Sequence, residues 1–172
     1  MALLPDSTML LSKQAYQRID HELSKFPEDR RQSAVLPALA IAQEELGWVS
    51  TEVMHELAEY IGVPPVSVQE VVTFYDMYNA KPVGRYKITV CTNLPCALRQ
   101  SMQAAEYLKQ KLGIDFDDTT ADGMFTLQEG ECMGSCGDAP VMLVNDRVMC
   151  VQMSESRMDT MIEELKRKGE SA

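Results

Sequence analysis

The chain has 172 residues, with 26 acidic and 16 basic side chains and a formal net charge of -10 at pH 7. Hydrophobic residues make up 45% of it and charged residues 24%, which is the composition of a globular protein that buries a core. The excess of acidic residues argues against a surface that binds nucleic acid or anionic lipid headgroups. The sequence shows no apolar stretch long enough to cross a bilayer and no signal or transit peptide. We therefore expect a cytosolic protein without membrane insertion.

All five cysteines lie between Cys91 and Cys150, and the first 90 residues contain none. In a reducing compartment, clustered cysteines are typical of metal ligands or redox thiols rather than disulfides. The hydrophobic pattern also changes from helical to strand period around residues 81–84. We therefore predict a helical domain over residues 1–82 and an α/β domain over residues 83–172.

Four segments of the first part repeat apolar residues at helical spacing, and we expect them to form a small bundle. Gly47 and Gly62 are expected to end the second and third helices. Ser67 and Glu70 have the spacing of a capping box at the start of the fourth. Ser12 and Ser50 are the predicted N-caps of the first and third helices. The second helix accommodates Pro37 if Ser33 is its N-cap, and an earlier start should kink it at Pro37. Pro64-Pro65 also marks the start of the fourth helix. The bundle core is expected to contain Trp48, Tyr60, Phe74 and Tyr75, unless the last two reach the junction between the parts.

The second part begins with an alternating, β-rich segment over residues 86–90. In chain order we then expect a helix after Cys96, a strand over 125–127, a hairpin with strands over 141–144 and 148–151, and a helix after Ser154. The hairpin turn is Asn145-Asp146. The helix after Cys96 presents one apolar face, which consists of Leu98, Met102, Ala105, Leu108 and Leu112. This order describes a small α/β sandwich, so the predicted fold class is α+β, a helical bundle followed by an α/β domain.

Four of the cysteines form two pairs, Cys91 with Cys96 and, after 35 intervening residues, Cys132 with Cys136. Each pair follows a predicted strand, where loop amides are free to donate hydrogen bonds to sulfur. The chain lacks the C-x2-C knuckle typical of structural zinc and the closely spaced runs of bacterial and plant-type clusters. Both histidines lie in the helical part, which argues against a Rieske centre. The spacing favours a 2Fe-2S cluster and leaves structural zinc and a redox or incidental thiol arrangement open.

Cys150 lies outside the two pairs, in a predicted strand of alternating apolar residues. We expect it to be a buried core thiol rather than a fifth ligand. Gly134 and Met133, between the last two paired cysteines, are expected to present backbone N–H groups to the cluster sulfurs, because glycine permits a close approach.

Several motifs together carry a resemblance to a known family. The segment that begins with Asp122-Gly-Met-Phe-Thr126, continues through Cys132-Met-Gly-Ser-Cys136 and ends with Ala139-Pro140 resembles the signature of the E-type subunit of NADH:quinone oxidoreductase. This family is the small, thioredoxin-like iron-sulfur subunit of respiratory complex I. The stretch Cys91-Thr-Asn-Leu-Pro-Cys96 is similar to its first ligand pair. Further matching segments are Gly47-Trp48, Thr73-Phe-Tyr75 and Lys81-Pro-Val-Gly84, so the resemblance extends from about Leu11 to Leu165 in the same order.

The resemblance implies a thioredoxin-like ferredoxin domain, preceded by a helical domain and carrying one 2Fe-2S cluster. Its ligands would be Cys91, Cys96, Cys132 and Cys136. It also implies docking on an F-type flavoprotein that binds NADH and FMN, single-electron exchange with that flavin, and assembly with the other complex I subunits. The expected location is the bacterial cytoplasm, at the periphery of the inner membrane. A thioredoxin-like fold further suggests a cis Ala139-Pro140 bond, with a trans bond left open.

The expected role is an oxidoreductase subunit that does not oxidise NADH by itself. The glycines of the cysteine region do not follow a strand with G-x-G-x-x-G spacing, so we expect the partner to bind the dinucleotide. An equivalent subunit of an NAD-linked hydrogenase or formate dehydrogenase remains an alternative, as does a zinc-stabilised interaction module. An isolated chain is also able to form a homodimer through the surface meant for the flavoprotein.

Overall fold

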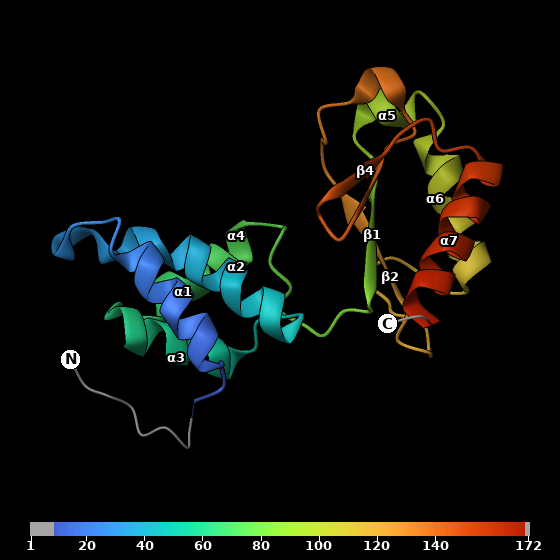
Figure 1. Ribbon diagram of the computed structural model, residues 1–172. Coiled ribbons are helices and arrows are strands. Elements are labelled where there is room, and N and C mark those ends of the chain that lie inside the picture. The colour runs from blue at the N-terminus through green and yellow to red at the C-terminus, as the bar shows by residue number, and fades with distance from the viewer. Residues whose placement is uncertain (1–8, 171–172) are drawn as a thin grey trace. The chain divides into compact units, whose positions relative to one another are not determined.

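The computed structural model describes residues 9–170. Contacts divide the chain into two compact units (Figure 1), unit 1 up to Pro82 and unit 2 from Val83. Each unit has a hydrophobic core of its own. Within residues 9–170, no helix is both long and apolar enough to cross a membrane.

Unit 1 is helical, as predicted. Its elements are α1 (Lys13–Leu23), the 3-10 helix η1 (Glu28–Ala34), α2 (Val35–Leu46), α3 (Thr51–Ile61) and α4 (Pro65–Phe74). Each α-helix contributes at least one residue that solvent does not reach, including Ile19, Leu39, Leu57 and Val68. Burial of these apolar faces stabilises four helices that are individually too short to be stable in water.

The helix ends of unit 1 agree with the sequence prediction in part. The hydroxyls of Ser12 and Ser50 accept from backbone N–H groups three residues later, at 3.2 and 3.3 Å, which confirms these two N-caps. Of the two alternatives for the second helix, Ser33 is not the N-cap, because η1 runs directly into α2, which begins at Val35. The start of the fourth helix at Pro64-Pro65 is confirmed, because Pro64 is the N-cap and α4 begins at Pro65; Ser67 lies inside the helix and is not its cap. Proline suits the first position of a helix, where its missing N–H needs no partner.

The aromatic residues expected in the core of unit 1 differ in their burial. Tyr60 is half-buried and packs on Tyr16, with ring centroids 4.6 Å apart. Phe74, in contrast, is 77% exposed, so its placement in the core is wrong. The buried face of α4 contains Val72, and a residue two positions later points to the opposite side of a helix.

Unit 2 is a four-stranded sheet in the order β2-β1-β3-β4. The strands are β1 (Tyr86–Cys91), β2 (Phe125–Gly130), β3 (Met142–Val144) and β4 (Val148–Cys150). β1 is parallel to β2 and antiparallel to β3, and β3 and β4 form the predicted hairpin. The helices α6 (Ser101–Leu112) and α7 (Glu155–Glu170) lie on one side of the sheet (Figure 1). The mixed architecture confirms the predicted α+β class.

The helix predicted after Cys96 is interrupted in the structure. A short helix, α5 (Leu94–Ala97), ends before α6, and Gln100 between them has a φ of 68°. The break turns the first predicted face residues away from the core, so that Leu98 is 80% exposed and Met102 is 43% exposed. Ala105 and Leu108 are buried as expected. A second 3-10 helix, η2 (Cys136–Asp138), follows β2.

Candidate metal centre

The parallel pairing of β1 and β2 brings the two cysteine segments to the same end of the sheet. Cys91, the last residue of β1, is in register with Gly130, the last residue of β2. Neighbouring strands lie about 4.8 Å apart, and Cys132 follows only two residues after Gly130. Both cysteine segments therefore begin at the same end of the sheet of unit 2.

The first pair lies in regular structure. Cys91 ends β1, and Cys96 lies in α5, where its backbone N–H donates to the Asn93 carbonyl at 2.8 Å. Both side chains are almost inaccessible, at 0% and 1%. The short loop and α5 thus fold Cys96 back beside the strand end, so that the two thiols lie together in a small apolar cluster with Ala139 and Val141.

Cys136 joins the first pair from the loop that follows β2. It is half-buried and packs against the cluster of Cys91 and Cys96. Burial raises the pKa of the Cys96 thiol to about 12, and the neighbouring Cys91 and Cys136 thiols contribute to this rise. Three of the four predicted ligands therefore lie in or against one apolar cluster. In Figure 1 the orange turn of η2 lies next to α5.

Cys132 is placed differently, because it is exposed on the loop. The Gly134 N–H donates to its Sγ at 3.4 Å, and Gly134 has a φ of 74°, which suits glycine. The predicted amide contact is thus found for Gly134. For Met133, no amide–sulfur hydrogen bond is found in the described part of the chain; its side chain packs against the apolar cluster instead.

The donor set fits an iron-sulfur cluster in its chemistry. The side chains that converge at this end of the sheet are thiols, the ligands that such clusters require. The buried Thr89 hydroxyl, two residues before Cys91 on the same strand, has no hydrogen-bond partner in residues 9–170, and a cluster would add sulfur acceptors to this region. In the same residues, no group of three or more His, Cys, Asp or Glu side chains is arranged to hold a metal ion as it stands. Cys91, Cys96 and Cys136 belong to one apolar cluster, and Cys132 lies outside it on the exposed part of the loop.

The sequence also led to expectations for Cys150 and for the Ala139-Pro140 bond. Cys150 is half-buried on β4, rather than fully buried as expected, and it packs against the core below α6 and α7. Its side chain is in register with Met142, on the strand face that the helices cover. Burial raises the pKa of this thiol. The Ala139-Pro140 bond is cis, the isomer that the resemblance suggests.

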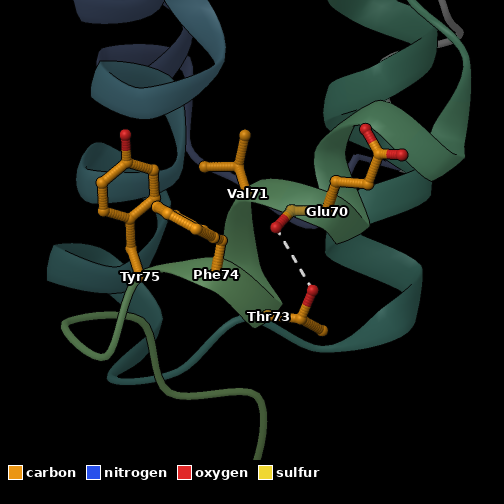
Figure 2. Close-up of a pocket in the computed structure, with 5 residues that line it drawn as sticks. All are labelled: Glu70, Val71, Thr73, Phe74 and Tyr75. Carbon is orange, nitrogen blue, oxygen red and sulfur yellow. Dashed lines mark hydrogen bonds between the residues drawn. The ribbon is translucent and has the colours of Figure 1, made fainter.

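Two exposed apolar features were not predicted from the sequence. Leu94 and Leu98 flank Cys96 and are 70% and 80% exposed. Leu98 fits the apolar repeat of the predicted helix, and this repeat does not reveal the break at Gln100. The second feature is a shallow cavity of about 420 Å³ in unit 1, which holds none of the cysteines. Figure 2 shows Phe74 and Tyr75 beside it in an edge-to-face pair, with centroids 5.0 Å apart.

Known proteins resemble this chain over most of its length. The NADH-quinone oxidoreductase subunit 2 of Thermus thermophilus is 35% identical over 144 residues, which are 84% of this chain and 80% of that protein. The E-type subunit of the NADH-quinone oxidoreductase of Rickettsia typhi is 39% identical over 143 residues, which are 83% of this chain and 84% of that protein.

Solved structures and the family comparison agree on the fold. The NAD+-reducing NiFe hydrogenase in its air-oxidized state matches with a TM-score of 0.69 and 23% identity. The match covers 83% of this chain but only 24% of the hydrogenase chain, and it shows a common fold. The family described as thioredoxin-like 2Fe-2S ferredoxin matches residues 19–166, a range that includes all four paired cysteines. The chain therefore belongs to the thioredoxin-like 2Fe-2S ferredoxin family.

Proposed function

We propose that this chain is the electron-transfer subunit of an NADH dehydrogenase module in an NADH:quinone oxidoreductase. Cys91, Cys96, Cys132 and Cys136 hold one 2Fe-2S cluster in this proposal, and an F-type flavoprotein partner binds FMN and NADH. The observation that carries it is that both cysteine segments begin at one end of the sheet of unit 2, with Cys91, Cys96 and Cys136 in or against one apolar cluster. The names of the two relatives support the choice of complex.

In this proposal the chain's own residues bind the cluster, orient its cysteine ligands and shield two of them from water. β1 and α5 hold Cys91 and Cys96 away from water, and the Gly134 N–H disperses charge on the Cys132 sulfur. A bound 2Fe-2S cluster supplies a one-electron centre, which a flavin needs because it receives two electrons from NADH and releases them singly. No general acid or base is required of this chain, which agrees with a site made of thiols and apolar side chains.

The exposed leucines beside Cys96 support a partner that covers this end of unit 2. Apolar side chains that protrude at 70% and 80% exposure next to a redox site are typical of a surface that another protein covers. Leu94 and Leu98 would then exclude water from the path between cluster and flavin. In the assembled complex the chain lies on the cytoplasmic side of the membrane, at its periphery, and contacts other subunits of the complex.

The metal content decides between the proposed cluster and a zinc-stabilised module. Protein purified without oxygen is expected to be brown, to contain two iron atoms per chain and to lose visible absorption on addition of dithionite. The reduced protein should give the electron paramagnetic resonance (EPR) signal of one 2Fe-2S centre. A colourless protein with stoichiometric zinc would overturn the proposal.

The identity of the partner protein can be tested by co-purification of the tagged chain from the native organism. The tagged chain should recover a flavoprotein with bound FMN, and the double variant Leu94→Ser/Leu98→Ser should recover several-fold less of it. Val148→Ser/Met149→Ser is the matched control, because Val148 and Met149 are 59% and 46% exposed on β4. Recovery of hydrogenase subunits instead would assign the chain to an NAD-linked hydrogenase.

A further inference from the structure

Gly130, at the end of β2, is closely approached by two side chains, one from the neighbouring strand and one from the loop that contains Cys132. A Cβ atom at this position would lie 2.6 Å from Thr89 Cγ2 and 3.1 Å from Met133 Cε. Both distances are tighter than ordinary van der Waals contact between carbon atoms. The missing side chain of Gly130 is therefore what allows Thr89, on the neighbouring strand, and Met133, on the loop, to approach the same point.

Met133 contacts both Gly130 and the apolar cluster that contains the thiols of Cys91 and Cys96. It stands between Cys132 and Gly134 in the chain, and its side chain is half-buried. The side chain reaches back over Gly130 to the sheet and packs against the apolar cluster that contains Cys91 and Cys96. Among the residues from Glu131 to Ser135, Met133 alone is assigned to a hydrophobic cluster in the described structure.

The rest of this loop has few contacts that would hold it in place. Cys132 is exposed, and its recorded hydrogen bond comes from Gly134 within the same loop. The Ser135 hydroxyl donates to the nearby Asp138 carboxylate at 3.4 Å. A ligand sulfur on such a segment loses conformational freedom when it binds metal, and this loss opposes binding.

We infer that Met133 is a positioning residue for the cluster: by packing over Gly130 it restricts the loop that carries Cys132 and so favours the conformations in which the Cys132 sulfur binds the cluster. This inference rests on the proposed cluster and deepens it, because it adds a residue that touches no iron. Apolar packing at this point restricts the loop before metal binds, so less freedom is lost on binding.

The test compares three variants of the brown, oxygen-free protein. Met133→Ala removes the packing, Met133→Leu keeps an apolar side chain, and Met149→Ala removes a methionine that is 46% exposed on β4. The measurements are the rate of cluster loss to an excess of an iron chelator and the EPR line shape after reduction. A lost contact of about 1.4 kcal/mol corresponds to a factor of ten. Met133→Ala should therefore lose its cluster roughly tenfold faster and show broadened or shifted EPR lines.

Met133→Leu and Met149→Ala should stay within about twofold of the parent in rate, with an unchanged line shape. Circular dichroism and thermal unfolding of the metal-free variants show whether Met133→Ala still folds; equal melting temperatures separate positioning from general stability. An unchanged loss rate and line shape in Met133→Ala would overturn the inference, as would an equal effect in Met149→Ala. A parent protein without iron would instead overturn the proposed function.

Discussion

The two cysteine segments of unit 2 begin at the same end of the sheet but differ in structure and burial. The segment from Cys91 to Cys96 is part of a strand and a helix, and both thiols are almost fully buried. The segment from Cys132 to Cys136 is a loop that ends in one 3-10 turn, with Cys132 exposed. The first segment is therefore built by folding alone, whereas the second depends on a few local contacts and, in our proposal, on the metal.

Because of this difference, we expect the first segment to contribute to the stability of the fold and the second segment to contribute mainly to cluster binding. A substitution in the first segment should affect both the stability of the metal-free chain and cluster binding. A substitution in the second segment should affect cluster binding with little change in the fold. The following predictions, from the largest expected effect to the smallest, test this separation.

The largest effect is expected for the iron content of ligand variants. Cys132→Ser should lose most of its iron, because serine replaces a thiolate that the cluster needs. Cys150→Ser should keep nearly all of it, since Cys150 lies on the sheet face covered by α6 and α7. Iron and sulfide analysis of both variants is the measurement, and equal losses would contradict the ligand assignment.

The stability of the metal-free chain should distinguish the two segments. Cys91→Ser places a hydroxyl in a fully buried apolar cluster and should lower the free energy of unfolding by about 1–3 kcal/mol. Cys132→Ser changes an exposed side chain and should stay within about 0.5 kcal/mol of the parent. Urea unfolding in the presence of a chelator and reductant measures both. Equal destabilisation would show that the loop is as much a part of the fold as the strand.

The strand pair that aligns the two segments depends on a close backbone approach. Gly84 precedes β1 and donates its N–H to Thr126 Oγ1 at 2.6 Å; a Cβ at this position would lie 2.9 Å from the backbone C of Phe125. Because backbone atoms move less easily than side-chain ends, Gly84→Ala should destabilise unit 2 by about 1–3 kcal/mol. Gly137→Ala, in the cysteine loop with open space around it, is the control. No difference between the two in thermal unfolding would refute the expected packing constraint.

A small pH dependence is expected from the turn before β2. Asp122 Oδ1 accepts from Thr120 Oγ1 at 2.5 Å and from the Met124 N–H at 2.9 Å, and these hydrogen bonds lower the pKa of the Asp122 carboxyl. A lowered pKa in the folded state means that the stabilisation is complete above the unfolded pKa of about 4 and is lost as the pH falls through the folded value. Asp122→Asn should therefore be less sensitive to acid than the parent. Parallel unfolding curves at neutral and acidic pH measure this, and identical slopes against pH would contradict it.

Much of the fold was predictable from local patterns. The helices of unit 1, the Ser12 and Ser50 caps, the strand that ends at Cys91 and the hairpin at Asn145-Asp146 all follow from apolar spacing and turn chemistry. The predictions for individual residues were wrong where burial depends on contacts with neighbours that the local apolar repeat does not specify. Phe74 fits the apolar repeat of a helix, yet the face that is buried depends on which neighbours pack there. Likewise, the break at Gln100 places Leu98 in solvent although its spacing is that of a core residue.

The sequence by itself determined the chemistry of this protein: four paired thiols, no histidine near them and a family signature around them. Ligand type and spacing are local properties, so they can be read from the chain directly. Only the tertiary structure decided that Cys91 and Gly130 lie in register and that Met133 folds back over Gly130. The first contact arises from the pairing of two strands that lie far apart in the chain, and the second from space that the missing side chain of Gly130 leaves beside Thr89 of the neighbouring strand; a linear pattern specifies neither of them.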